Sequence, residues 1–155
     1  MTTSERPVVL LLSGPNLNLL GEREPEVYGT AALEDHVALA RKRADEHGLE
    51  LEHLQSSSEA ALVDAVQGAR GRCAAIVVNA GALTHYAWSL HDALATFDGP
   101  VVELHLSNPN AREPWRHTSV VAPVADGSIA GFGGHGYGLA IDAAANLLED
   151  HAGPR

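Results

Sequence analysis

The amino-acid sequence predicts an α/β protein in which helices cover both faces of a parallel sheet. Short runs rich in Val, Leu and Ile are typical of strands that are buried on both faces. They alternate with stretches of about 12 residues at helical spacing, which indicates βαβ units. Five such units in 155 residues favour a three-layer αβα sandwich with a five-stranded parallel sheet in flavodoxin-like order, the first strand lying beside the third.

The strands are expected where short apolar runs stop at turn-forming or polar residues. The first run ends at Gly14-Pro15, a dipeptide that breaks both helices and strands. In chain order, the five expected strands are PVVLLLSG, LELEHLQ, AAIVVNAG, PVVELHLSN and GSIAGFG.

The helices are expected from their caps and from apolar residues at helical spacing. Thr30 is placed to cap the first helix, which would end at Gly48. Ser56 and Glu59 form a capping box for the second helix. The apolar faces of the first three helices are predicted to carry Leu33, Val37, Ala40 and Ala44; Leu62, Ala65, Val66 and Ala69; and Leu90, Ala93, Leu94 and Phe97. The closing helix is expected over YGLAIDAAANLLEDH.

Length and composition predict a single domain over residues 1–155, with an ordered core over about 7–150 and short tails at both ends. No apolar run approaches the roughly 18 residues that span a bilayer, and the N-terminal run is too short for a secretory signal. The single Cys73 suits a reducing cytoplasm. The formal charge of −10 argues against nucleic acid or an anionic membrane as a partner.

Polar residues follow three of the expected strands, where open α/β sheets bind their ligands. Asn16 follows the first strand, and Asn79 and His85 follow the third. Gly81 would let a backbone N–H approach a ligand closely. Taken alone, Asn79 is equally compatible with a turn-forming residue, and His85 with a helix-start residue that has no role.

The fourth strand carries two polar side chains in an otherwise apolar run. Glu103 and His105 alternate and therefore project on the same side, where a carboxylate would orient the imidazole and favour its protonated form. A purely structural Glu–His pair is the alternative. Beyond the strand, Arg112 and Arg116 are four residues apart, so a helical turn would put both on one face as an anion clamp.

Two features limit the alternatives. The stretch GFGGHG, Gly131 to Gly136, matches a dinucleotide-binding pattern, but no later strand supplies a ribose-binding acid, so we favour tight packing of strand against helix. A non-catalytic module that binds a nucleotide or flavin there is the competing hypothesis. The only lysine, Lys42, lies on a charged helix face, which disfavours imine chemistry, and no Cys/His spacing predicts a metal site.

Several separated motifs together resemble one family across nearly the whole chain. The stretches GPNLNLLGEREPEVYG, QSSSEAALVDAV, NAGALTH, HDAL, ELHLSNPNAREPWRHTS and GFGGHGY are similar, in this order, to those of the type II 3-dehydroquinate dehydratases of the shikimate and quinate pathways. The resemblance implies a flavodoxin-like fold and a dodecamer of four trimers. It also implies dehydration of 3-dehydroquinate to 3-dehydroshikimate through an enolate, without imine, cofactor or metal.

The resemblance also implies catalytic roles. Tyr28 would be the base that removes the proton next to the ketone, and Arg23 would hold it ionised. Asn16 would position a water that steadies the enolate. His105, oriented by Glu103, would protonate the departing hydroxyl.

The remaining implied residues bind substrate. Asp92 would reach a neighbouring subunit's site across the trimer, the backbone at Leu106 and Ser107 would bind the carboxylate, and Arg112 would be a supporting contact. The full set is Asn79, Gly81, His85, Asp92, Leu106, Ser107, Arg112 and Arg116. The chain departs from the family pattern at Ser57, Ser58, Trp115 and His135, none of which has an implied catalytic role.

The stretch LLGEREPEVYGT, residues 19–30, is open to two interpretations from its residues alone. Gly, Pro and Glu are typical of inert, solvated loops. With the resemblance, the stretch is expected to be a mobile, non-helical lid that carries Tyr28 and Arg23 over the substrate and excludes water.

Overall fold

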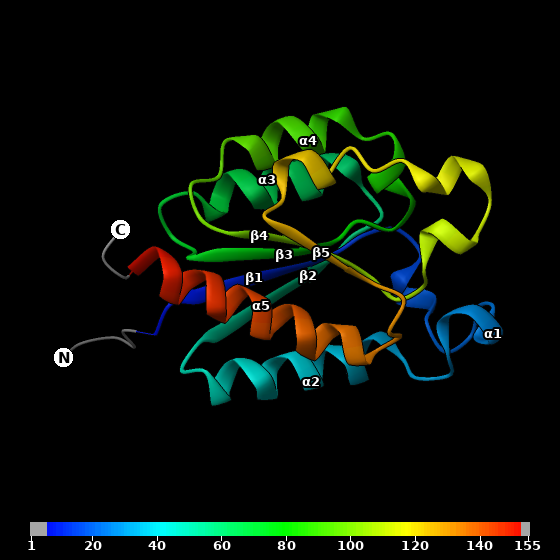
Figure 1. The fold of residues 1–155 in the computed structure, drawn as a ribbon, viewed down its shortest axis with the longest axis horizontal. Coiled ribbons are helices and arrows are strands. Elements are labelled where there is room, and N and C mark those ends of the chain that lie inside the picture. Colours follow the sequence, from blue (N-terminus) through cyan, green and yellow to red (C-terminus); the bar gives the residue numbers. More distant parts are fainter. Residues whose placement is uncertain (1–5, 153–155) are drawn as a thin grey trace.

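A computed structural model describes residues 6–152, which build one five-stranded parallel sheet in the order β2-β1-β3-β4-β5 (Figure 1). This order has the first strand beside the third, as expected. The tails expected at the two ends lie largely outside the described residues. The main elements are β1 Val8–Ser13, α1 Pro25–Tyr28, α2 Leu33–Glu46, β2 Glu50–Gln55, α3 Glu59–Ala69, β3 Ala75–Asn79, α4 Trp88–Ala95, β4 Val101–His105, β5 Gly127–Ala130 and α5 His135–Ala152.

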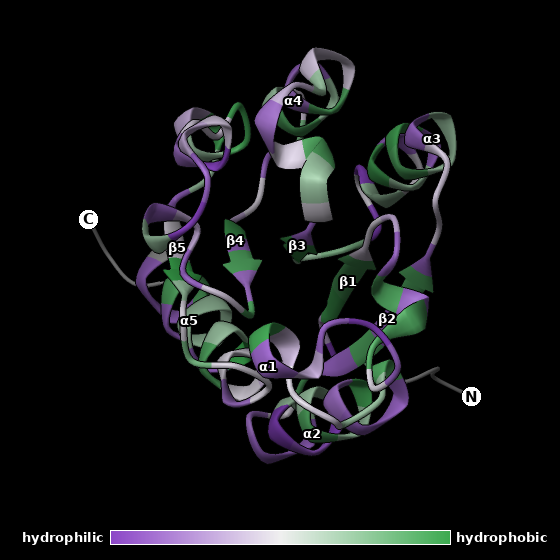
Figure 2. Ribbon diagram, turned by 90° about the vertical axis from the view of Figure 1, so that its right-hand side faces the viewer, coloured by the Kyte–Doolittle hydropathy of each residue, from purple (hydrophilic) through white to green (hydrophobic). Residues whose placement is uncertain are grey.

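Two helical layers enclose the sheet. Figure 2 looks onto the carboxyl ends of the strands, with α3 and α4 on one face of the sheet and α2 and α5 on the other. Alternate residues of a strand point to opposite faces, so β1 contributes to two separate cores. Val9 and Leu11 pack with α2 and α5, whereas Leu10 and Leu12 pack with α3 and α4. The apolar run in β1 is continuous because both faces of this strand are buried.

The helices begin later than the cap residues predicted from the sequence. Helix α2 starts at Leu33, and the Ala32 N–H donates to Asp35 Oδ2 at 3.0 Å, so an acidic residue in the first turn replaces the predicted cap Thr30. At α3, Ser58 Oγ accepts from the Ala61 N–H at 3.2 Å. The predicted cap Ser56 instead accepts from the Ser58 N–H and shapes the turn before the helix. Both predicted caps were wrong by about two residues.

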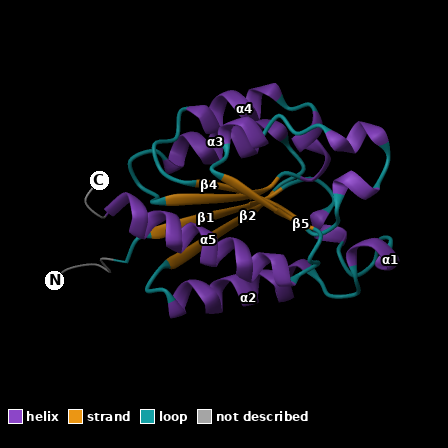
Figure 3. Ribbon diagram, in the orientation of Figure 1, coloured by secondary structure: helices purple, strands orange, loops and turns teal. Residues whose placement is uncertain are grey.

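Residues 19–30 include a helical turn, which the sequence prediction of a non-helical segment missed. Pro25 occupies the first helical position, where its missing N–H costs nothing. Glu24 with φ 36° and Gly29 with φ 83° bound the turn on its two sides. These two backbone reversals confine the helix to Pro25–Tyr28 and leave Tyr28 at its last position (Figure 3).

Strands β1 and β3 approach each other closely at their carboxyl ends. The Gly14 N–H donates to the Asn79 carbonyl at 2.8 Å. A Cβ on Gly14 would lie only 2.4 Å from the Ala80 carbonyl oxygen, so this position has no room for a side chain. The close approach brings the loop that carries Asn16 next to Asn79. Among the residues described, no helix has the length and apolar character that a bilayer crossing needs.

A matched pair of glycine substitutions tests this close approach. Gly14→Ala forces a methyl group against backbone and should lower the free energy of unfolding by roughly 2 kcal/mol or more. Gly68→Ala in α3 meets nothing within 4 Å and should raise it by about 0.5 kcal/mol. Urea unfolding followed by circular dichroism measures both values. Equal effects of the two substitutions would contradict the proposed packing constraint.

Candidate active site

A cavity of about 160 Å³ opens at the carboxyl ends of β1, β3 and β4. It lies at the edge of the sheet where the sequence placed the ligand. The predicted site residues that line it are Asn16, Arg23, Tyr28, Asn79, Gly81, His85, His105, Leu106, Ser107, Arg112 and Arg116. Two predicted residues do not line it: Glu103 lies behind His105, and Asp92 is exposed on α4.

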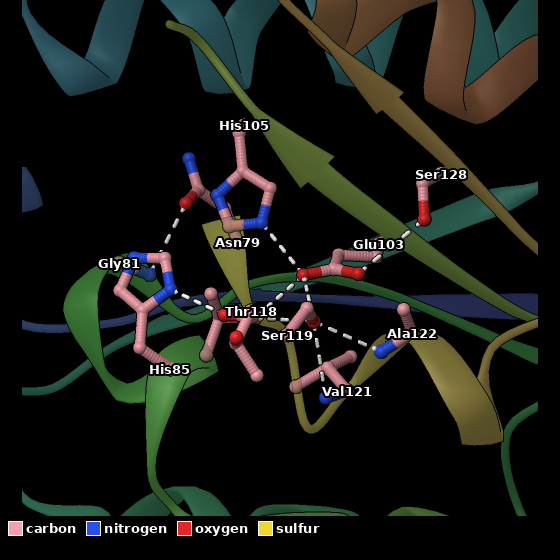
Figure 4. A network of polar contacts seen from close by, with 11 residues as sticks. Asn79, Gly81, His85, Glu103, His105, Thr118, Ser119, Val121, Ala122 and Ser128 are labelled. Carbon is pink, nitrogen blue, oxygen red and sulfur yellow. Dashed lines mark hydrogen bonds and ion pairs between the residues drawn. The ribbon is translucent and has the colours of Figure 1, made fainter. Parts of the chain in front are cut away.

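His105 is held by a buried carboxylate two residues earlier in β4. Its Nε2 lies 2.7 Å from Glu103 Oε2 (Figure 4). An ionised carboxylate only accepts hydrogen bonds, so Nε2 is the donor and Nδ1 is the nitrogen left for the cavity. The sequence prediction that both side chains project on the same side of the strand is confirmed. The contact orients the imidazole.

Glu103 gathers hydrogen-bond donors from three other segments (Figure 4). Its Oε2 accepts from Thr84 Oγ1 at 2.5 Å and from Ser119 Oγ at 2.8 Å, and its Oε1 accepts from Ser128 Oγ at 3.3 Å. Burial alone would raise the pKa of the Glu103 carboxyl, but hydrogen bonds from His105 and Thr84, the charge of His105 and the bond from Ser119 together lower it. Glu103 is therefore an ionised group in the interior of the sheet.

The sequence interpretation missed the three hydroxyl residues around Glu103. Thr84 lies in the 3₁₀ turn Gly81–His85, Ser119 in a loop and Ser128 in β5. Nothing in a single sequence distinguishes these from other serines and threonines. The only indication in the sequence was Glu103 itself, because a buried carboxylate requires hydrogen-bond donors from other parts of the chain.

Tyr28 meets two guanidinium groups in the cavity. Arg112 Nη1 donates to Tyr28 Oη at 2.8 Å, and the Cζ of Arg23 lies 4.4 Å from the centre of the Tyr28 ring. Arg23 also pairs with Glu24 at 3.2 Å, which restrains its direction. Arg112 thus makes the direct contact with the phenol oxygen, and Arg23 lies over the ring face.

The side of the cavity formed by β3 presents an amide and an imidazole. Asn79 is 2% exposed, and its Oδ1 accepts from the Gly81 N–H at 3.3 Å. Gly81, with φ 59°, thus uses its N–H within the protein. His85 Nδ1 lies 2.7 Å from the Thr118 carbonyl oxygen, to which it donates (Figure 4). Both side chains are therefore held in defined orientations.

Arg112 directly follows the 3₁₀ turn Pro109–Ala111, and Arg116 lies in the next one, Pro114–His117. The two arginines therefore do not share one helical turn as predicted. Arg112 Nη1 donates to Ser107 Oγ at 3.0 Å, so it joins the end of β4 to Tyr28. Arg116 Nε donates to Glu113 Oε2 at 3.0 Å. Their convergence in the cavity nevertheless gives two guanidinium groups that suit a carboxylate-bearing ligand.

The glycine-rich stretch lies away from this cavity. Gly131, Gly133 and Gly134 border a separate hollow on the other side of Tyr28 and Arg112. Within residues 6–152, no group of three or more His, Cys, Asp or Glu side chains is arranged to hold a metal ion. The polar side chains that line the cavity thus include a phenol, two imidazoles, three guanidinium groups and two amides.

Comparison with known proteins points to one family. The family model Dehydroquinase class II matches residues 7–145. The chain is 54% identical over 138 residues to 3-dehydroquinate dehydratase 1 of Corynebacterium efficiens, covering 89% of this chain and 91% of that protein. It is 48% identical over 147 residues to 3-dehydroquinate dehydratase 2 of Pseudomonas putida, covering 95% and 99%. The crystal structure of type II dehydroquinase from Butyrivibrio crossotus superposes with a TM-score of 0.87 at 40% identity, covering 91% of this chain and 98% of that one.

The lowered pKa of Glu103 predicts that acid destabilises the fold. The unfolded chain binds a proton at this carboxyl near its ordinary value of 4.5, whereas the folded protein keeps it ionised to lower pH. Unfolding therefore takes up a proton, and the free energy of unfolding should fall as the pH falls below about 4.5 through the folded pKa. Urea titrations between about pH 6 and pH 3.5 measure this fall.

A pair of variants assigns the effect. Glu103→Gln binds no proton and should show a flatter pH dependence, although it is less stable at neutral pH. Glu46→Gln, at an exposed carboxylate of α2, should keep the original slope. The same slope in Glu103→Gln as in the unaltered protein would contradict the assignment.

Proposed function

The chain belongs to the class II dehydroquinase family, and we propose that Tyr28 is the base and His105 the acid with which it removes water from 3-dehydroquinate to give 3-dehydroshikimate. One observation carries the assignment of roles. The cavity is lined both by a phenol whose oxygen accepts from a guanidinium and by an imidazole backed by a buried carboxylate. An elimination next to a ketone requires a base and an acid, and these two groups can supply them.

Proton removal is assigned to Tyr28. A phenolate is a base only if its charge is stabilised, and the nitrogen of Arg112 at 2.8 Å with the guanidinium of Arg23 over the ring supports that state. A cation about 4 Å from an anion contributes roughly 4 kcal/mol at an effective dielectric near 20. Tyr28 takes the proton from the carbon next to the ketone, and the electrons of that C–H bond move onto the ketone oxygen as an enolate.

Stabilisation of the enolate is assigned to Asn16. This residue follows β1 in a left-handed backbone conformation, with φ 69°, and lines the cavity. A side-chain amide at that position can hold a water whose hydrogen points at the enolate oxygen. Asn79 and Gly81 form the neighbouring wall of the cavity and are assigned to substrate binding.

Departure of the hydroxyl is assigned to His105. With Nε2 bonded to Glu103, a proton on Nδ1 can pass to the hydroxyl that leaves. The enolate electrons form the new C=C bond, the C–O bond breaks, and the hydroxyl departs as water. Tyr28 has then gained one proton and His105 has lost one. Before the next turnover, a proton must therefore pass from Tyr28 to His105 through solvent or the water that has left.

Substrate binding is assigned to the groups that surround this pair. Ser107 and the backbone at Leu106 line the end of β4, where Arg112 adds a positive charge suited to the substrate carboxylate. His85 and Arg116 line the same cavity and suit the ring hydroxyls. Lys42, the only lysine of the chain, is exposed on α2 and does not line the cavity, which supports a mechanism without an imine.

A dodecamer built from four trimers is proposed as the active assembly. Helix α4 starts with Trp88, which is 62% exposed, and Tyr86 just before it is 61% exposed. Exposed aromatic side chains of this size are typical of interfaces. Asp92 lies one turn after Trp88 on the same face of α4. This placement supports a contact in which Asp92 reaches the site of a neighbouring subunit.

The role of Tyr28 is tested by removing one oxygen atom. Tyr28→Phe should lower kcat by about a thousandfold or more, because the base is lost, while 3-dehydroquinate still binds within a fewfold of its original affinity. Formation of the conjugated enone is followed by its ultraviolet absorbance, and binding by calorimetry. The control Thr96→Val removes a hydroxyl that donates to the Ala93 carbonyl and does not line the cavity, and it should keep full activity. Near-normal turnover in Tyr28→Phe would sink the assignment.

The assembly is tested by sedimentation velocity. The unaltered protein should sediment as twelve chains, and Trp88→Glu should give smaller species, because it places a charge in the proposed contact. Trp88→Tyr keeps an aromatic contact and should keep the large assembly. A large assembly in Trp88→Glu, or a monomeric unaltered protein, would refute this interface.

A further inference from the structure

We propose that Tyr137 is a positioning residue for the site: its buried phenol holds the Asn79 side chain in the orientation in which that amide meets substrate. The inference rests on the proposed role of Asn79 in binding. Tyr137 lies on α5, on the face of the sheet opposite α3 and α4, and it is not among the residues that line the cavity. It acts only through Asn79.

The contacts of Asn79 fix the direction of its amide. Its Oδ1 accepts from the Gly81 N–H at 3.3 Å, so the oxygen is the end that faces Gly81. The Nδ2 group then points the other way and donates to Tyr137 Oη at 3.2 Å. Both residues are almost fully buried, at 2% and 1% exposed. Without the phenol oxygen, that N–H would face the interior with no acceptor at this position.

The Tyr137 phenol has a second polar contact, which links it to strand β1 and through it to β2. Ser13, at the end of β1, also hydrogen bonds Tyr137, and Ser13 Oγ lies 2.9 Å from His53 Nε2 on β2. Burial raises the pKa of Tyr137 to about 12, so the phenol remains neutral and serves as a hydrogen-bonding group. With His53 neutral, one consistent direction satisfies every group: Asn79 donates to Tyr137, Tyr137 to Ser13 and Ser13 to His53.

The glycine-rich stretch explains how Tyr137 reaches this position. A Cβ on Gly134 would lie 2.2 Å from His36 Cε1, and one on Gly136 would lie 3.0 Å from Leu104 Cδ1. Glycines at these places let α5 begin close against α2 and β4. The His36 ring, 7% exposed, stacks on the Tyr137 ring with centres 5.2 Å apart. The stretch that resembles a dinucleotide motif thus sets the depth at which Tyr137 enters the core.

Loss of the phenol oxygen should change KM and not kcat. An Asn79 amide released from Tyr137 can rotate away from the substrate, which weakens binding in the ground state and the transition state alike. Loss of such uniform binding raises KM and leaves kcat nearly unchanged. One net hydrogen bond corresponds to roughly five- to tenfold in an equilibrium constant.

A double-mutant cycle tests the proposal. Tyr137→Phe keeps the ring and its stacking on His36, and it should raise KM for 3-dehydroquinate by about five- to tenfold with kcat changed less than about twofold. In an Asn79→Ala background, where KM is already raised, Tyr137→Phe should add less than about twofold. Thr96→Val removes a hydroxyl that donates to the Ala93 carbonyl at the end of α4, and it should leave KM unchanged.

The outcomes separate the possible failures. An unchanged KM in Tyr137→Phe, or the same increase with and without Asn79, would overturn the positioning role and point to a purely structural residue. An unchanged KM in Asn79→Ala would overturn the binding role of Asn79 and this inference with it, while leaving Tyr28 and His105 as base and acid. Circular dichroism at the assay temperature shows that each variant is folded.

Discussion

A carboxylate buried inside a parallel sheet must be surrounded by donors, and the arrangement of this site depends on how Glu103 meets that requirement. An uncompensated charge at this depth would cost several kcal/mol. Hydroxyl groups from the turn after β3, from the loop that contains Ser119 and from β5 meet it together with His105. The same four contacts that keep the charge stable also fix the imidazole and tie the walls of the cavity to β4.

Most of the fold was predictable from the periodicity of apolar residues, because the faces of a helix or strand that are buried determine where its apolar residues recur. The parallel sheet followed from strands that alternate with helices, and its order from five βαβ units in a chain of this length. The Glu103–His105 pair followed from the alternation of side chains along a strand. Caps were predicted less well, since several neighbouring Ser, Thr and Asp residues compete to satisfy the same N–H groups, as at Ser56 and Ser58. The hydroxyl donors around Glu103 were not predictable, because contacts between residues distant in sequence leave no local pattern.

The stretch Gly131–Gly136 illustrates how one pattern can arise from two physical causes. In a dinucleotide site, glycines allow backbone to approach a pyrophosphate. Here they allow a helix to approach a histidine ring and a strand. Both causes require the absence of a Cβ, so the spacing of glycines alone does not separate them. What separates them is the position of the polar groups, which gather after β1, β3 and β4 and not at the glycines.

The hydrogen bond from Arg112 to Tyr28 joins two stretches of chain separated by 84 positions. A change in the length of either connection would displace one partner relative to the other. At the opposite edge of the sheet, Gly48 and Gly71 have open space where a side chain would begin, whereas Gly99 is packed against the Ala74 carbonyl oxygen. The connections after β1 and β4 are coupled in length in a different way, because a hydrogen bond inside the cavity joins them.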